Sequence, residues 1–254
     1  METVIEVRNL HREYVTYKGA LHRKKEVVEA VRGIDFTVNR GEIFGLLGQN
    51  GAGKTTTIKM LTTLLALTSG MCKVFGCDTF GQEKQIRKHI NFIFGGEMGV
   101  YRRLSGRDNL RYFANLYLMD TAERESRINE ILELVELTDA ADRLAETYSK
   151  GMTQRLQIAR GLINDPEIIF MDEPTVGLDP LGAHMLRGII RKLRDDGKTV
   201  LLTTHYLPEA EELCDRIVIL NHGEIAARGT PEEIKGDSAT LEEAYISLIK
   251  GDVQ

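Results

Sequence analysis

A glycine-rich segment in the first quarter of the chain carries the residues with the clearest chemistry. It matches the pattern GxxxxGK[ST] and continues with one more threonine: Gly48, Gln49, Asn50, Gly51, Ala52, Gly53, Lys54, Thr55 and Thr56. An apolar run typical of a buried strand precedes it, and a helical pattern from about residue 54 to 66 follows it, which is the context that this motif requires. Glycines let backbone N–H groups turn toward phosphate oxygens, and the helix N-terminus adds partial positive charge. The segment therefore predicts a loop that binds the phosphates of a nucleotide.

Three side chains of this phosphate loop have predicted roles in binding a nucleoside triphosphate. Lys54 is expected to reach the β- and γ-phosphate oxygens, the Thr55 hydroxyl to bind Mg²⁺, and Thr56 to contact the α-phosphate. The sequence has no Asn-Lys-x-Asp motif, which GTPases use to recognise guanine. ATP and Mg²⁺ are therefore the predicted cofactors, and Lys54 is a predicted catalytic residue.

Two adjacent carboxylates, Asp172 and Glu173, follow a second apolar run at residues 168–171. Asp172 suits a contact with Mg²⁺, and Glu173 suits the general base that orients the attacking water molecule. His205 follows another apolar run. Because ligands collect where the carboxyl ends of parallel strands meet, we expect all three side chains near the phosphate loop. His205 is then expected to contact the γ-phosphate.

The elements that must position these residues alternate between strands and helices. Such alternation is typical of a parallel sheet with helices on both faces. Residues 104–162 have a helical pattern instead, which predicts a helical subdomain inserted into an α/β core. The predicted strands are 4–7, 27–38, 43–47, 90–94, 168–171, 200–203 and 217–220.

Composition narrows the class of protein. The net charge of −5 and the pI near 5.8 disfavour a nucleic-acid partner, which needs a concentrated basic face. The basic cluster at residues 22–25 is expected to be a solvated loop. Three cysteines without a CxxC pair fit a reducing cytosol better than a disulfide framework or a zinc site. No signal peptide and no apolar run long enough for a membrane helix are seen, so a membrane role would require a partner.

With these motifs in place, nearly the whole chain resembles the nucleotide-binding subunit of an ABC transporter. The segment 148–155, Tyr-Ser-Lys-Gly-Met-Thr-Gln-Arg, resembles the family signature LSGGQ-x-QR. Ser149 and Gly151 match that signature, whereas Tyr148, Lys150 and Met152 depart from it. Residues 177–180, which include Asp179, resemble the D-loop, and residues 203–205 resemble the segment with the switch histidine. The variant signature and the C-terminal segment 223–243 resemble the exporter branch with separate permeases.

The resemblance implies a fold and a mode of action. It implies a P-loop NTPase core with a parallel sheet flanked by helices, an N-terminal antiparallel β region and an inserted helical subdomain. Residues 1–254 would then form one ABC ATPase domain, with 1–97 and 165–254 as the α/β core and about 98–164 as the helical subdomain. Ser149 is expected to cap a helix whose N-terminus closes on ATP held by a second subunit. Ser149, Gly151 and Asp179 are accordingly expected to contribute to nucleotide binding.

The expected partners are membrane permease subunits and a second ATP-binding subunit, identical or different, paired head-to-tail around two ATP molecules. The chain would lie peripherally at the cytoplasmic face of the membrane and couple ATP-driven dimerisation and hydrolysis to export. The alternative is a soluble ABC ATPase that acts on nucleic acid or the ribosome. That alternative is disfavoured because the chain lacks a second cassette, a long coiled-coil insertion and zinc-binding cysteines.

Two positions depart from the family pattern. Where the family keeps a glutamine, this chain has Gly95-Gly96-Glu97, and Glu97 is either a water-mediated Mg²⁺ contact or a solvated loop residue. The aromatic residue that stacks on adenine would fall near residues 25–26, where there is none. Tyr14 or Tyr17 is the expected substitute.

Overall fold

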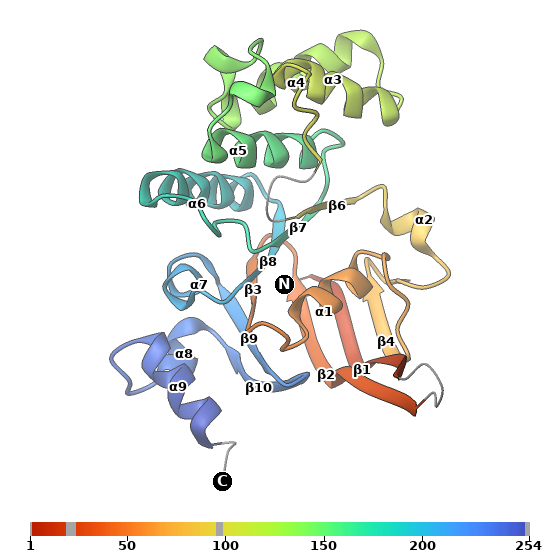
Figure 1. The fold of residues 1–254 in the computed structure, drawn as a ribbon, viewed down its shortest axis with the longest axis vertical. Coiled ribbons are helices and arrows are strands. Elements are labelled where there is room, and N and C mark those ends of the chain that lie inside the picture. The colour runs from red at the N-terminus through yellow and green to blue at the C-terminus, as the bar shows by residue number, and fades with distance from the viewer. Residues whose placement is uncertain (1, 19–23, 95–98, 252–254) are drawn as a thin grey trace. The chain divides into compact units, whose positions relative to one another are not determined.

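The computed structural model describes residues 2–18, 24–94 and 99–251, which fall into two compact units (Figure 1). Unit 1 comprises Met1–Arg87 and Leu201–Gln254, and unit 2 comprises Lys88–Val200. Strand β8 (Thr199–Thr204) begins in unit 2 and ends in unit 1. The predicted division at residues 98 and 164 stays a prediction.

An antiparallel sheet in unit 1 has the strand order β2-β1-β4-β5. The first two strands pair from Thr3 opposite Asn39 to Lys18 opposite Lys24. Strand β4 pairs with the first part of β1 only. The strands are β1 (Thr3–Lys18), β2 (Lys24–Asn39), β4 (Ser69–Val74) and β5 (Cys77–Asp78).

The first two strands are longer than the runs 4–7 and 27–38 predict. The pairing register shifts several times along β1, and Asn9 has a φ of 45°. Such bulges interrupt the period-two alternation of side chains, so the pattern conceals that the strand continues. Lys24 and Lys25 lie in β2, which corrects the predicted basic loop, and the other two residues of that cluster are outside the described residues.

The second sheet of unit 1 has the strand order β10-β9-β3-β8. Strand β3 is buried along its whole length and pairs parallel with β9, whereas β10 pairs antiparallel with β9. Continuous burial is typical of parallel strands that are covered on both faces. The elements are β3 (Ile43–Leu47), β9 (Arg216–Asn221), β10 (Glu224–Gly229), α1 (Lys54–Leu61), α2 (Glu83–Ile86), α7 (Leu207–Leu213), α8 (Pro231–Lys235) and α9 (Leu241–Gly251).

Unit 2 combines the strand order β8-β7-β6 with several helices (Figure 1). Strands β6 and β7 pair parallel, and the chain between them forms α3, α4 and α5, as the helical pattern predicts. Helix α6 follows β7 and buries Leu186, Ile189, Ile190 and Leu193. The elements are β6 (Ile90–Ile93), α3 (Gly106–Leu116), α4 (Thr121–Leu134), short 3₁₀ turns at Thr138–Ala140 and Ala145–Thr147, α5 (Lys150–Gly161), β7 (Ile168–Asp172) and α6 (Pro180–Asp195).

Candidate functional site

The phosphate loop of unit 1 lies between β3 and α1 and needs glycine at defined positions. Gly48 has a φ of 149° and Gly53 a φ of 106°, which side-chain-bearing residues rarely adopt. A Cβ atom on Gly48 would collide with the backbone oxygen of Leu220, and one on Gly53 would lie 2.6 Å from the backbone oxygen of Ala30. The loop therefore packs closely against neighbouring backbone. Glycine is needed at these two positions both for the positive φ and because there is no room for a side chain.

The N-terminus of α1 is a candidate site for an anion. Its N-cap residue, Gly53, makes no side-chain capping hydrogen bond. Side chains do cap α3, α4, α5, α6 and α8, through Ser105, Asp120, Ser149, Asp179 and Thr230. The first amides of a helix need partners, and an anion such as phosphate can supply them. The loop thus fits the triphosphate that its sequence predicts.

Lys54 is buried at the start of α1, with 5% of its surface exposed. Its Nζ atom donates hydrogen bonds to the carbonyl oxygens of Gly48 at 2.6 Å and of Gln49 at 3.2 Å. The ammonium group is therefore held against the loop itself. A buried cation beside the N-terminus of a helix is a donor set that suits phosphate oxygens, and the neighbouring residue Thr55 is exposed.

A cavity of about 490 Å³ opens beside the phosphate loop in unit 1. His205 lies on its wall together with the loop, so the strand-end argument placed this histidine correctly. The wall also includes residues of α9, and the sequence analysis predicted no site residue in that helix. Burial raises the pKa of Tyr245 on α9, although hydrogen bonds from the backbone and side chain of Gln49 oppose that shift. The lining residues are Gly48, Gln49, Asn50, His205, Leu207, Glu242, Tyr245 and Ile246.

The two carboxylates belong to unit 2, at the end of β7. Asp172 is the last residue of the strand and Glu173 is the next, and both are half-buried. Glu173 has a φ of 53°, which is rare for a residue with a side chain. Backbone in such conformations is concentrated at functional sites. The turn that begins at Glu173 leads to Asp179, which caps α6 by accepting a hydrogen bond from the amide of Gly182 at 2.7 Å.

The signature segment is also in unit 2, where Ser149 is the N-cap of α5 as predicted. Its hydroxyl accepts a hydrogen bond from the amide of Met152 at 3.2 Å, and Ser149 itself is exposed. Lys150, a departure from the family signature, places its ammonium group where a Cβ of Gly177 would stand. The signature and D-loop segments therefore touch within this unit. Gly151 is half-buried in the first turn of the helix.

Comparisons with known proteins agree with this set of motifs. The family model described as ABC transporter matches residues 31–176. The chain is 39% identical over 227 residues to the ABC transporter ATP-binding protein NatA of Bacillus subtilis, covering 89% of this chain and 92% of that protein. The chain belongs to the ABC transporter ATP-binding family. It is also 44% identical over 226 residues to a fluoroquinolones export ATP-binding protein of Mycobacterium tuberculosis, covering 88% of this chain and 73% of the relative.

Solved structures of ABC ATPases have the same fold. An ATP-binding subunit of an ABC transporter superposes with a TM-score of 0.78 at 31% identity, covering 97% of this chain and 99% of that one. A dimeric ATP-binding cassette in a post-hydrolysis state, bound to ADP and Pi, has a TM-score of 0.76 at 27% identity, covering 89% and 98%. The predicted P-loop NTPase fold is confirmed. So is the prediction of an ABC transporter subunit that hydrolyses ATP with Mg²⁺.

Some expectations about this ABC ATPase are not settled by its geometry. Tyr14 is half-buried, and the Arg12 guanidinium lies 4.8 Å from its ring centroid, so one face of that ring is already covered. The side chain of Tyr17 and the segment Gly95-Gly96-Glu97 are outside the described residues. Both the adenine contact and the substitute for the family glutamine stay predictions.

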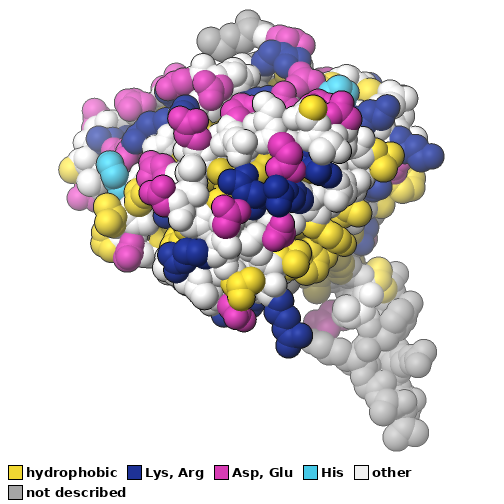
Figure 2. Space-filling view, turned by 90° about the horizontal axis from the view of Figure 1, so that it is seen from above, with side chains coloured by type: hydrophobic (Ala, Val, Ile, Leu, Met, Phe, Trp, Pro, Cys, Tyr) yellow, Lys and Arg dark blue, Asp and Glu magenta, His cyan; other side chains and the backbone are white. Residues whose placement is uncertain are grey.

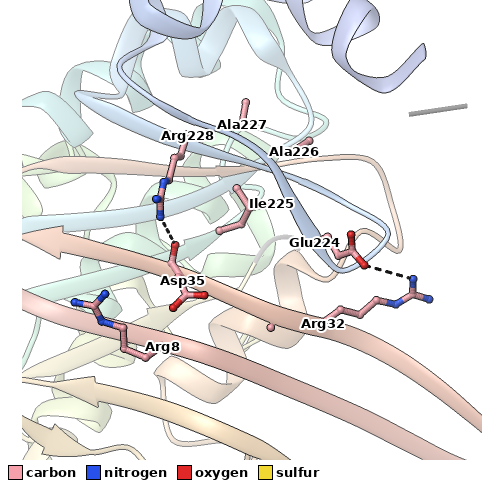
Figure 3. Close-up of a pocket in the computed structure, with 9 residues that line it drawn as sticks. Arg8, Arg32, Asp35, Glu224, Ile225, Ala226, Ala227 and Arg228 are labelled. Atoms are coloured by element: carbon pink, nitrogen blue, oxygen red, sulfur yellow. Dashed lines mark hydrogen bonds and ion pairs between the residues drawn. The ribbon is translucent and has the colours of Figure 1, made fainter. Parts of the chain in front are cut away.

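A second and larger cavity in unit 1, of about 680 Å³, lies between β10 and the first two strands (Figure 3). Five of the nine residues that line it are charged. Arg228 donates a hydrogen bond to the carbonyl oxygen of Asp35 at 3.0 Å, and Arg32 lies 4.0 Å from the carboxylate of Glu224. None of the predicted site residues is among those that line it, so this cavity is not the candidate ATP site of the ABC ATPase.

Proposed function

We propose that this chain is the ATPase subunit of an exporter with separate membrane permease subunits. Two such subunits, identical or different, would pair head-to-tail around two ATP molecules, and closure and hydrolysis would drive export. The observation that carries the proposal is that the chain offers two helix N-termini suited to phosphate. One is the N-terminus of α1, where no side chain caps the helix, and the other is the exposed, Ser149-capped end of α5.

The relatives support the transport class. They are named for a transporter and for fluoroquinolone export, and the chain covers most of each of them. Among the described residues, no helix has both the length and the apolar character to cross a membrane. As a transporter subunit, the chain would lie at the cytoplasmic face of the membrane and contact it through the permease. On the face drawn in Figure 2, Lys and Arg side chains alternate with Asp and Glu, which does not favour the nucleic-acid alternative.

The proposed chemistry assigns one task to each side chain. Lys54 would hold the β- and γ-phosphate oxygens, and Glu173 would accept the proton of the attacking water. Bound Mg²⁺ would neutralise charge on the phosphates, held by Thr55 and, through water, by Asp172. His205 would contact the γ-phosphate beside Gly48 and Gln49. The other subunit would contribute its Ser149, Gly151 and Asp179.

Replacing Ser149 by arginine tests the head-to-tail arrangement. The larger side chain would occupy the space of the phosphate bound by the other subunit, so hydrolysis and ATP-dependent dimerisation should be abolished. ATP binding by the monomer should be unchanged, because the phosphate loop is in unit 1. Nucleotide affinity and size exclusion with ATP and Mg²⁺ measure the two properties separately.

Ser149→Ala is the matched control, since it removes the cap without adding bulk. It should cost roughly 0.5–2 kcal/mol of stability and leave dimerisation detectable. Loss of ATP binding by the Ser149→Arg monomer would show that Ser149 supports only the fold of its own chain, and would contradict the head-to-tail pairing.

An exposed apolar cluster in unit 2, here called the α3 patch, is the proposed docking surface for the permease. It consists of Tyr101, Tyr112, Leu116 and Leu118, of which Leu118 is 91% exposed and Leu116 61%. The Tyr101 and Tyr112 rings meet edge to face, with centroids 4.8 Å apart. Large apolar side chains that gather at a surface mark interaction sites. An apolar cytoplasmic segment of the permease would fit this chemistry.

Leu118→Glu should disrupt that docking. We expect ATPase activity of the isolated subunit within about twofold of wild type, and loss of the stimulation that the permease produces when the complex is reconstituted in liposomes. Leu64→Glu is the control, because Leu64 is 56% exposed but belongs to unit 1. Equal stimulation of the Leu118→Glu and wild-type subunits would exclude the α3 patch as the docking surface. Stimulation by DNA or ribosomes instead of the permease would favour the alternative function.

A further inference from the structure

Arg160 lies in the last turn of the signature helix α5, at the opposite end from Ser149. The two positions are 11 residues apart in the sequence, which corresponds to about 16 Å along a helix. A helix of this length moves as one body, so a force applied at Arg160 displaces Ser149 as well. The residues that contact Arg160 can therefore influence the position of Ser149 in the signature segment.

The guanidinium group of Arg160 makes two different contacts within unit 2. Its Nη1 atom donates a hydrogen bond to the carbonyl oxygen of Gly99 at 2.9 Å. The Cζ atom of Arg160 lies 5.1 Å from the ring centroid of Phe113 on α3, which is within cation–π range. A planar guanidinium can donate a hydrogen bond to a carbonyl from its edge and stack on an aromatic ring with its face. A lysine ammonium group cannot make both contacts in this way. Burial lowers the pKa of Arg160, which agrees with a partly desolvated position.

Only glycine fits at position 99 beside the Arg160 guanidinium. Its φ of 93° suits glycine, and a Cβ atom at this position would collide with Nη1 of Arg160. Gly99 belongs to the connection between β6 and α3, two residues after the Gly95-Gly96-Glu97 segment where the family pattern has its glutamine. The arginine therefore ties α5 to the backbone of that connection.

The same arginine also reaches the aromatic residues behind the α3 patch. Phe113 contacts Tyr112 with centroids 5.3 Å apart and Tyr101 with centroids 6.1 Å apart. Both tyrosines are members of the α3 patch. A molecule that displaces these rings would displace Phe113, and Phe113 lies against the guanidinium of Arg160.

We propose that Arg160 is a positioning residue that couples occupancy of the α3 patch to the placement of the signature helix. This inference rests on the proposed function, in which the permease docks on that patch. Movement of the rings or of the Gly99 connection shifts the guanidinium, and α5 carries the shift to Ser149. Arg160 itself touches no nucleotide in this scheme.

The test is the ratio of permease-stimulated to basal ATPase activity, measured on the subunit–permease complex in liposomes and on the subunit alone. Arg160→Met keeps an apolar side chain of similar reach but removes the charge and the donors. We expect basal activity within about twofold of wild type and a stimulation ratio lowered by about fivefold or more. Arg160→Lys, which retains the charge, should restore part of the ratio.

Arg155→Met is the matched control on the same helix. Arg155 also donates from Nη1 to backbone carbonyls, of Val135 at 3.1 Å and Glu136 at 3.0 Å, but neither belongs to the patch or its connection. Its loss should lower stability without changing the ratio. Thermal unfolding of both variants shows whether they are destabilised alike. If Arg160→Met does not fold, Phe113→Leu removes the ring that joins Arg160 to Tyr101 and Tyr112, leaves the hydrogen bond to Gly99, and should still lower the ratio.

Three outcomes would overturn the inference. The first is an unchanged stimulation ratio in Arg160→Met, or in Phe113→Leu if Arg160→Met does not fold. This result refutes the coupling alone when Leu118→Glu still abolishes stimulation. Equal losses of the ratio in Arg160→Met and Arg155→Met would reduce Arg160 to a stabilising role. A wild-type complex that shows no stimulation would refute the proposed function, and the coupling would fail with it.

Discussion

Glu173→Gln is expected to lower ATP turnover by roughly 10²–10⁴-fold while ATP binding survives. Glutamine keeps the size and hydrogen bonding of the side chain but cannot accept a proton from water. The unusual backbone conformation of Glu173 should be retained, because the substitution changes only the end of the side chain. Steady-state phosphate release and nucleotide affinity measure the two quantities.

The same variant should trap ATP and accumulate as a dimer on size exclusion with ATP and Mg²⁺. Glu130→Gln is a suitable control, because Glu130 is an exposed carboxylate on α4 that pairs with Arg127 at 2.8 Å. That control should turn over ATP like the wild type. Turnover of Glu173→Gln within about twofold of wild type would remove Glu173 from the role of base.

Lys54→Ala should act on ATP binding itself. The substitution removes the ammonium group that is proposed to hold the phosphates and that donates to the carbonyl oxygens of Gly48 and Gln49. Charge-assisted hydrogen bonds contribute about 1.5–3 kcal/mol, so the Kd for ATP should rise by about 10–100-fold. Calorimetric titration with Mg²⁺-ATP measures the change.

Lys59→Ala is the control for this effect. Lys59 lies in the last turn of the same helix and is half-buried, but it is outside the phosphate loop. Its loss should leave the Kd for ATP unchanged. If Lys54→Ala bound ATP as tightly as Lys59→Ala, the phosphate loop would not be the ATP site.

Much of the candidate site was predictable because its geometry is local. The phosphate loop depends on backbone angles that glycine favours, on an adjacent strand and on an adjacent helix, and all three are visible within about 20 residues. Ser149 is recognisable as an N-cap for the same reason, since capping joins residues three apart. The placement of His205 beside the loop needed one further rule, that parallel strands present their carboxyl ends at one edge.

The length of the first hairpin was not predictable in the same way. Its bulges shift the side-chain alternation, and only pairing with the opposite strand maintains β1 as far as Lys18. Local periodicity therefore underestimates a strand whose register changes. Helix α1 shows the converse error, because the helical pattern runs to about residue 66 and the helix ends at Leu61. Thr63, with a φ of 62°, turns the chain away from the helical conformation.

The sequence by itself predicted the phosphate-binding loop, the carboxylate pair, the signature cap and the α/β class. Each of these depends on contacts between residues close in the chain or on the periodicity of one element. Only the tertiary structure decided that Tyr245 reaches Gln49 and that Arg160 joins Gly99 to Phe113. These partners are 47 or more residues apart in the sequence, and no local pattern encodes which distant backbone a long side chain will meet. Packing alone brings them together.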